Sequence, residues 1–313
     1  KQKIAQGQWK PIADGEEIEP KDGYDVVSTI NINIQDIAHH ALLAQLEKYQ
    51  ADHGCAIVME VATGEIKAIS NLGLNSEGKY AERFNYALGE TYEPGSVFKT
   101  MSLATAMEEA QIDTTYVVDT KKGVISFYGQ NVWDSNKKGY GKINLSKAIQ
   151  VSSNTAIVQM IHDVFGKDPK KFVGKLNKMH LNKKLGLPVA GEGEPYLPQP
   201  NQRGWSGIAL EWMAFGYGLK MTPLQVLTFY NAIANNGVML KPRMIKEVKQ
   251  WNKSIEKFDL EVLNSSICSE QTATKVKKVL ENTVKYGTGK SLYSPHFSMA
   301  GKTGASQKDY SDK

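Results

Sequence analysis

Short apolar runs near the two ends of the chain predict β-strands. The first half carries one such run and then two more, which are separated by a four-residue turn over 62–65 that contains Gly64. A further apolar stretch precedes Lys302 close to the other end. The predicted strands cover residues 24–30, 55–61, 66–70 and 296–301.

Apolar residues spaced three and four apart predict helices through the middle of the chain. Two starts carry local capping signals: Asn33 is followed by Asp36, and Thr222 is followed by Pro223 at the first helical position. The predicted helices start at Asn33, cover 96–110 and 155–165, run from Thr222 to 235, and run from a cap at Ser269 to a stop at 287.

Two long segments predict loops: 71–91 is polar, and 185–205 is rich in proline and glycine. Helices therefore dominate the middle, with strands on either side. This order predicts an α+β fold, in which the first and last strands join one antiparallel sheet flanked by helices.

Composition and charge exclude several classes of function. The net charge is +5, carried by 35 Lys and only 3 Arg, and base recognition in nucleic acids relies mostly on Arg. We therefore expect no nucleic-acid partner. The six His show no metal-ligand spacing, so neither a metal nor a cofactor is expected. Cys55 and Cys268 could form one disulfide or remain two buried thiols, and no run of 18 apolar residues indicates a membrane span.

The sharpest chemical motif is Glu-Pro-Gly-Ser-Val-Phe-Lys over residues 93–99. Ser96 and Lys99 are three apart, so on a helix they share a face, and the amine can reach the hydroxyl. A Ser nucleophile needs a base, and Lys is a base when burial or a nearby cation lowers its pKa. The alternative is that Ser96 only caps a helix and Lys99 is solvated.

Two further motifs contain residues that can serve an acyl-transfer site. Ser152 and Asn154 lie two residues apart where one helical pattern gives way to the next, although Ser-x-Asn can also be an ordinary cap. Lys302, Thr303 and Gly304 follow the last predicted strand, and Gly304 would let an extended substrate approach. The alternative for this motif is a turn at a strand end.

Together, in this order, the three motifs resemble those of penicillin-binding proteins and serine β-lactamases. Further runs resemble class B penicillin-binding proteins, and the septal, division type more than the elongation type. These runs are Glu-Pro-Gly-Ser over 93–96, Phe-Gly-Tyr-Gly over 215–218, Thr-Pro-Leu-Gln over 222–225 and Ala-Asn-Asn-Gly over 234–237.

The resemblance implies the transpeptidase fold of this superfamily, an antiparallel sheet flanked by helices plus a mainly helical subdomain. It also implies a peptidoglycan D,D-transpeptidase that is acylated and inhibited by β-lactams. Ser96 would be the nucleophile, Lys99 its base, and Lys302 the cation that helps to keep Lys99 neutral. Ser152 would pass a proton to the leaving D-alanine, and Asn154 would hold the substrate backbone. Lys302 and Thr303 would bind the terminal carboxylate, next to Gly304, and the N–H groups of Ser96 and Ala305 would form the oxyanion hole.

The resemblance also implies where the protein works and what lies beyond this chain. Residues 1–23 would be a lead-in from an upstream non-catalytic domain, and 24–313 a transpeptidase domain without its C-terminal strands. We expect an N-terminal anchor in the cytoplasmic membrane, a catalytic domain on the extracytoplasmic side, and division-complex membrane proteins as partners, alongside peptidoglycan stem peptides. Ala305 departs from the family, which usually has Thr at that position.

Two other functions fit the same motifs. A serine β-lactamase is the nearest enzyme, but the closest match to its deacylating Glu-x-x-Leu-Asn loop, Glu261 to Asn264, is one residue short. A β-lactam sensor domain would be acylated without turnover.

Overall fold

A computed structural model describes residues 2–3, 9–10 and 22–307 of the chain. Most of the predicted lead-in over 1–23 lies outside these residues. Two compact units are present: Lys1–Ser28 with Ile245–Phe258, and Thr29–Met244 with Asp259–Lys313.

The smaller unit contains a three-stranded antiparallel sheet in the order β13-β12-β3. The hairpin between β12 and β13 turns at Trp251 and Asn252, which both have a positive φ, as in the two-residue turns that match strand twist. The predicted strand 24–30 contains β3. The strands of this unit are β3 (Asp25–Ser28), β12 (Ile245–Gln250), β13 (Lys253–Lys257) and an antiparallel pair, β1 (Gln2–Lys3) and β2 (Trp9–Lys10).

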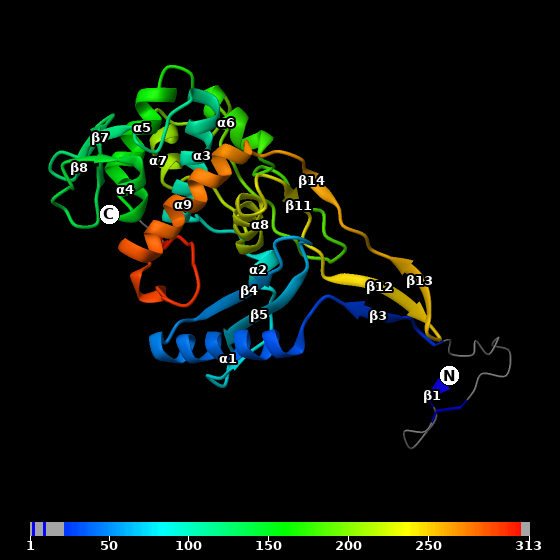
Figure 1. Ribbon diagram of the computed structural model, residues 1–313. Helices are drawn as coiled ribbons and strands as arrows, with labels where there is room; N and C mark the ends of the chain where they lie inside the picture. Colours follow the sequence, from blue (N-terminus) through cyan, green and yellow to red (C-terminus); the bar gives the residue numbers. More distant parts are fainter. Residues whose placement is uncertain (1, 4–8, 11–21, 308–313) are drawn as a thin grey trace. The chain divides into compact units, whose positions relative to one another are not determined.

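In the larger unit, an antiparallel sheet of β4 (His53–Met59), β5 (Ile66–Leu74) and β6 (Tyr80–Ala81) packs against helix α1 (Ile32–Tyr49) (Figure 1). The predicted hairpin is present, but β5 continues to Leu74, into a segment that was expected to be irregular. The predicted cap at Asn33 is wrong. Asn31 caps α1, because its side chain accepts hydrogen bonds from the N–H groups of Asn33 and Ile34.

Helix α3 (Lys99–Ala110) is the centre of the main core, since every residue from Lys99 to Met107 is buried. Four helices pack around it: α4 (Leu145–Gln150), α5 (Asn154–Phe165), α6 (Pro169–Lys178) and α9 (Glu270–Tyr286). The other helical elements are α2 (Tyr86–Gly89), η2 (Gly95–Phe98), α7 (Ala209–Ala214), α8 (Pro223–Ala234) and η3 (Lys290–Leu292).

Short strand pairs complete the larger unit: β7 (Val117–Asp119) with β10 (Lys142–Asn144), β8 (Val124–Phe127) with β9 (Gln130–Trp133), and β11 (Met239–Leu240) with β14 (Val262–Asn264).

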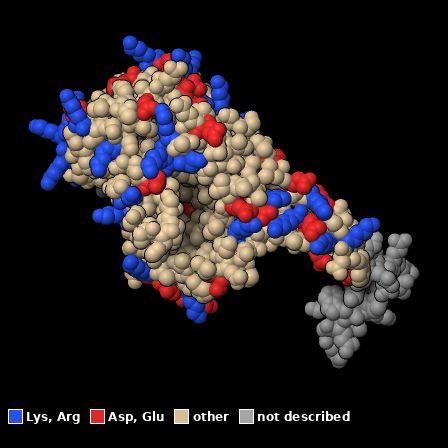
Figure 2. Space-filling view, viewed as in Figure 1, with Lys and Arg blue, Asp and Glu red and all other residues tan. Residues whose placement is uncertain are grey.

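The lysine-rich segment over 167–184 lies at the surface, since six of its seven lysines are exposed. Figure 2 shows basic and acidic side chains interspersed over one face of the molecule.

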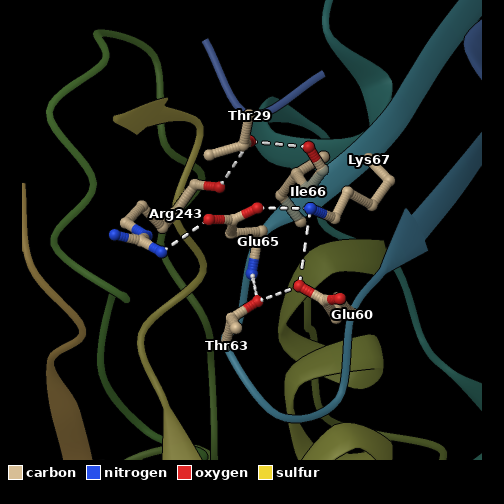
Figure 3. A network of polar contacts seen from close by, with 7 residues as sticks. All are labelled: Thr29, Glu60, Thr63, Glu65, Ile66, Lys67 and Arg243. Carbon is tan, nitrogen blue, oxygen red and sulfur yellow. Dashed lines mark hydrogen bonds and ion pairs between the residues drawn. The ribbon is translucent and has the colours of Figure 1, made fainter. Parts of the chain in front are cut away.

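A buried ionic cluster links the turn between β4 and β5 to the segment before β12 (Figure 3). Glu65, whose side chain is 9% exposed, pairs with Arg243 at 2.6 Å and also with Lys67, which in turn lies 3.4 Å from Glu60. Thr29 donates its hydroxyl to the carbonyl groups of Ile66 and Arg243. Two distant chain segments, at 29 and 243, are thereby fixed to the same hairpin.

The predicted α+β class is confirmed: antiparallel sheets and helices make up the fold. The strand predicted over 296–301 is wrong, and so is the expectation that first and last strands share a sheet. Within residues 22–307, this segment pairs with no strand, and a lone extended segment lacks the ladder of hydrogen bonds that defines one. None of the helices described here is long and apolar enough to cross a bilayer.

Candidate active site

Ser96 lies in a tight turn that two glycines make possible. It belongs to the 3₁₀ turn η2 rather than to α3, so the predicted helix 96–110 begins as 3₁₀. Gly95 has φ +59° and donates its N–H to the carbonyl of Gly216 at 3.1 Å. A Cβ on Gly95 would overlap the carbonyl oxygen of Ala305, and one on Gly216 would overlap the backbone of Gly95. The segments around 95, 216 and 305 therefore meet at van der Waals contact beside the serine.

Lys99 is the first residue of α3, and its side chain is completely buried. Its amine donates to the carbonyl of Ser152 (2.6 Å), the Ser152 hydroxyl (3.1 Å) and Asn154 Oδ1 (2.5 Å). Ser96 Oγ makes no hydrogen bond to this amine among the described residues, although both belong to the same turn of chain. The amine is thus held by the second motif.

The Ser152–Asn154 segment leads from the turn after α4 into the first residue of α5. Ser152 has φ +57°, a conformation uncommon for a non-glycine residue and often found at functional sites. Ser153 caps α5, since its hydroxyl accepts a hydrogen bond from the N–H of Ala156 at 3.1 Å. The local role of Ser-Ser-Asn as a helix cap therefore falls to Ser153, which leaves Ser152 and Asn154 to face Lys99.

Lys302 reaches the same turn from the far end of the chain. Its amine donates to the Ser152 hydroxyl at 2.9 Å and to the carbonyl of Thr303 at 2.8 Å. Thr303 shares a hydrogen bond of 2.6 Å with the hydroxyl of Thr288. A Cβ at Gly304 would lie 2.7 Å from a methyl group of Val97, so only glycine lets this segment pass so close to the serine turn.

Two amines therefore converge on one hydroxyl. Burial lowers the pKa of Lys99 well below its ordinary value, and the charge of Lys302 lowers it further, while the carboxylate of Asp134 acts in the opposite sense. Burial also lowers the pKa of Lys302, to about 8. At neutral pH this arrangement favours a neutral Lys99 beside a cationic Lys302.

These elements border a cleft of about 1190 Å³. Lys99 and Lys302 connect to it through Ser152, and no group of three or more metal-ligating side chains occurs in the described part of the chain. The predicted site residues that line the cleft are Ser96, Ser152, Asn154, Thr303, Gly304 and Ala305.

Spacing did not reveal Asp134, which directly follows β9 and is 1% exposed. It accepts hydrogen bonds from Ser153 and Thr155, on either side of Asn154. Its donors lie about twenty residues further along the chain. A single Asp before a polar loop carries no local signal of that contact.

The family described as "Penicillin binding protein transpeptidase domain" matches residues 54–313. Stage V sporulation protein D of Bacillus subtilis is 27% identical over 97% of this chain and 47% of its own length. The probable peptidoglycan D,D-transpeptidase PbpC of Pseudomonas aeruginosa is 27% identical over 94% of this chain and 51% of its own. The chain thus spans about half the length of these relatives.

Solved structures give the same picture. Apo penicillin binding protein 3 of Mycobacterium tuberculosis is 27% identical, with a TM-score of 0.81 over 93% of this chain and 67% of that one. Its complex with aztreonam is 28% identical, with a TM-score of 0.80 over 91% of this chain and 65% of that one.

Proposed function

We propose that this chain, which belongs to the penicillin-binding protein transpeptidase domain family, is the catalytic part of a peptidoglycan D,D-transpeptidase of septal wall synthesis. The observation that carries the proposal is the hydrogen-bonded line from Lys99 through Ser152 to Lys302 at the cleft that Ser96 lines. Relatives named as peptidoglycan D,D-transpeptidases support the reaction class.

In the acylation step, Ser96 Oγ attacks the carbonyl carbon between the two terminal D-alanines of a stem peptide. The hydroxyl proton passes to neutral Lys99, whose low pKa leaves it free to accept a proton at neutral pH. The C–N bond then breaks, and Ser152 gives its proton to the leaving D-alanine. Lys99 returns a proton to Ser152 along their 3.1 Å contact, so the step balances.

The remaining residues hold the substrate. Cationic Lys302 and the Thr303 hydroxyl bind the terminal carboxylate, and Asn154 orients the peptide backbone. The N–H groups of Ser96 and Ala305 stabilise the oxyanion. Because Gly304 has no side chain, an extended substrate can lie close to the serine turn. An amine from a second stem then attacks the ester carbonyl, and its proton moves to Lys99. As the ester C–O bond breaks and the cross-link forms, Lys99 returns a proton to Ser96 Oγ, which restores the free hydroxyl.

β-Lactams would occupy the same site as mimics of D-Ala-D-Ala. The structural relatives solved with aztreonam and with ampicillin support this part of the proposal. A membrane anchor, an extracytoplasmic location and division-complex partners belong to the whole protein and are proposed with it.

The first test is the intact mass of the protein after exposure to benzylpenicillin. We expect one penicilloyl adduct per chain, and none in Ser96→Ala. Ser76→Ala is the matched control, because Ser76 and Lys79 have the same spacing but lie at an exposed turn. An adduct that persists in Ser96→Ala would overturn the assignment of the nucleophile.

Turnover separates the proposal from its two rivals. A transpeptidase keeps the adduct for many minutes, and a membrane-bound, full-length form cross-links a lipid-linked precursor. Rapid hydrolysis of penicillin would instead indicate a β-lactamase. A stable adduct without any cross-linking by the full-length protein would indicate a sensor.

A further inference from the structure

We propose that Asp134 is a positioning residue of this site: it holds the Ser152–Asn154 segment where Ser152 and Asn154 can accept hydrogen bonds from Lys99. The inference rests on the proposed function. In the described residues, Asp134 makes no hydrogen bond to Ser96 or to Lys99. It acts through the residues on either side of Asn154.

Three donors converge on the Asp134 carboxylate. Its Oδ1 accepts from the Ser153 hydroxyl (2.9 Å) and from the N–H of Thr155 (3.0 Å), and its Oδ2 accepts from the Thr155 hydroxyl (2.8 Å). An ionised carboxylate is acceptor-only, so this form matches all three donors. The N-terminus of α5 is thereby bonded to a carboxylate that is 1% exposed.

The residue before Asp134 fixes Asn154 itself. Trp133 accepts a hydrogen bond at its carbonyl from Asn154 Nδ2 at 2.6 Å. Because the amide nitrogen is occupied there, the opposite atom, Oδ1, points to Lys99 Nζ at 2.5 Å. Residues 133 and 134 together hold the last two residues of the second motif, Ser153 and Asn154, and Thr155 directly after it.

Asp134 is itself fixed from the other side. Its N–H donates to the carbonyl of Gly123 at 2.8 Å, and its carbonyl accepts from the N–H of Lys137 at 2.9 Å. The support for the turn therefore comes from the β8–β9 hairpin and the loop after it, not from α5. Such support residues matter because a displacement of about 1 Å at a reacting group can lower a rate about a hundredfold.

The charge of Asp134 predicts a shift in the pH dependence of acylation, which a purely structural role would not produce. The groups that interact electrostatically at this point in the described chain are Lys99, Lys302, Asp134 and Tyr140, whose pKa is raised by burial and by Asp134. Asp134 raises the pKa of Lys99 against the larger effects of burial and Lys302. Removal of its charge should therefore let Lys99 lose its proton at lower pH.

The test measures the second-order rate constant for acylation by a fluorescent penicillin across pH 5 to 10. Asp134→Asn keeps the shape and removes the charge. We expect its rate at pH 7 to fall about 10- to 100-fold, and the acid limb of its pH profile to shift to lower pH. Asp119→Asn is the matched control. Asp119 ends β7, and among the described residues its side chain accepts a hydrogen bond only from the N–H of Lys121, so its profile should superimpose on wild type.

Thr155→Val provides a second variant that leaves the charge in place, in case Asp134→Asn does not fold. It removes one donor, so we expect about a fivefold slower acylation with an unmoved acid limb. A wild-type rate and profile in Asp134→Asn, or a wild-type rate in Thr155→Val, would overturn the role of Asp134. Absence of a Ser96 adduct in the wild-type protein would instead overturn the proposed function.

Discussion

Two clusters of charged side chains in the larger unit, one around Glu65 and one around Ser152, are built on opposite principles. Around Glu65, one carboxylate with a 9% exposed side chain is shared by Arg243 and Lys67 (Figure 3). Around Ser152, two lysines meet one hydroxyl, and no carboxylate bonds either amine among the described residues.

The balance of charge decides what each cluster can do. A hydrogen bond to Glu65 raises the pKa of Lys67, so this amine stays charged and serves only as a fixed partner. Lys99 lies in the opposite situation: burial and a neighbouring cation lower its pKa, which makes a proton acceptor of it. In the proposed mechanism, lysine is therefore a structural residue at position 67 and a proton acceptor at position 99.

The largest expected effect comes from the same substitution at both lysines. Arginine is always protonated and cannot accept a proton, so Lys99→Arg replaces the neutral base by a cation and should reduce acylation by penicillin about a thousandfold. Lys67→Arg should leave the acylation rate unchanged, because the cluster around Glu65 needs only a cation. Stopped-flow or gel-based labelling measures both rates, and thermal unfolding shows whether each variant is folded. A Lys99→Arg rate within tenfold of wild type would show that Lys99 is not the base.

Glu65→Gln tests the other half of the comparison, through stability rather than rate. The substitution removes the carboxylate that Arg243 and Lys67 share. We expect the free energy of unfolding to fall by about 2 to 3 kcal/mol, less than for a fully buried pair because the two cations remain about one-fifth exposed. Denaturant titration at pH 7 measures the loss.

Glu60→Gln is the matched control for that loss. Glu60 pairs with the same Lys67, but its carboxylate is 45% exposed, so its loss should cost far less than that of Glu65. Equal stabilities of the Glu65 and Glu60 variants would contradict a structural role for the cluster. The pH profile of acylation should be the same in both variants.

The sequence predicted those elements whose signals are local. Helix α8 begins where Thr222 and Gln225 predict it, because the reciprocal cap between them depends on neighbouring residues alone. The resemblance to penicillin-binding proteins, drawn from short motifs, is confirmed by the family match. In contrast, the end of β5 and the conformation of 296–301 depend on which strands lie alongside, and a single strand does not encode its neighbours.

The same limit applies to the site. Motif spacing pointed to Ser96, Lys99 and Ser152, and the structure brings Lys99 to Ser152. The positive φ of Ser152, and the contact of the Asp134 carboxylate with the first turn of α5, arise only when the β8–β9 hairpin folds back on α5. Contacts made across the fold need side chains to be placed before they can be recognised.

The smallest expected effect is a pH dependence that only the Ser152 cluster should show. In the proposed mechanism, acylation needs a neutral Lys99, so we expect the acylation rate to rise as pH increases through the pKa of Lys99. It also needs a cationic Lys302, so the rate falls as pH increases through about 8. For the loss of one proton, the fall between pH 8 and pH 9 is about fivefold.

Lys302→Arg sharpens this prediction, because arginine stays charged throughout that range. Its acylation rate should lack the fall above pH 8 and should keep the acid limb of the wild type. Lys67→Arg should reproduce the complete wild-type profile, since the pKa of Lys67 is raised and the group does not titrate between pH 6 and pH 9. An alkaline limb that persists in Lys302→Arg would mean that another group titrates near pH 8. The chemical difference between the Glu65 cluster and the Ser152 cluster would then rest on the lowered pKa of Lys99 alone.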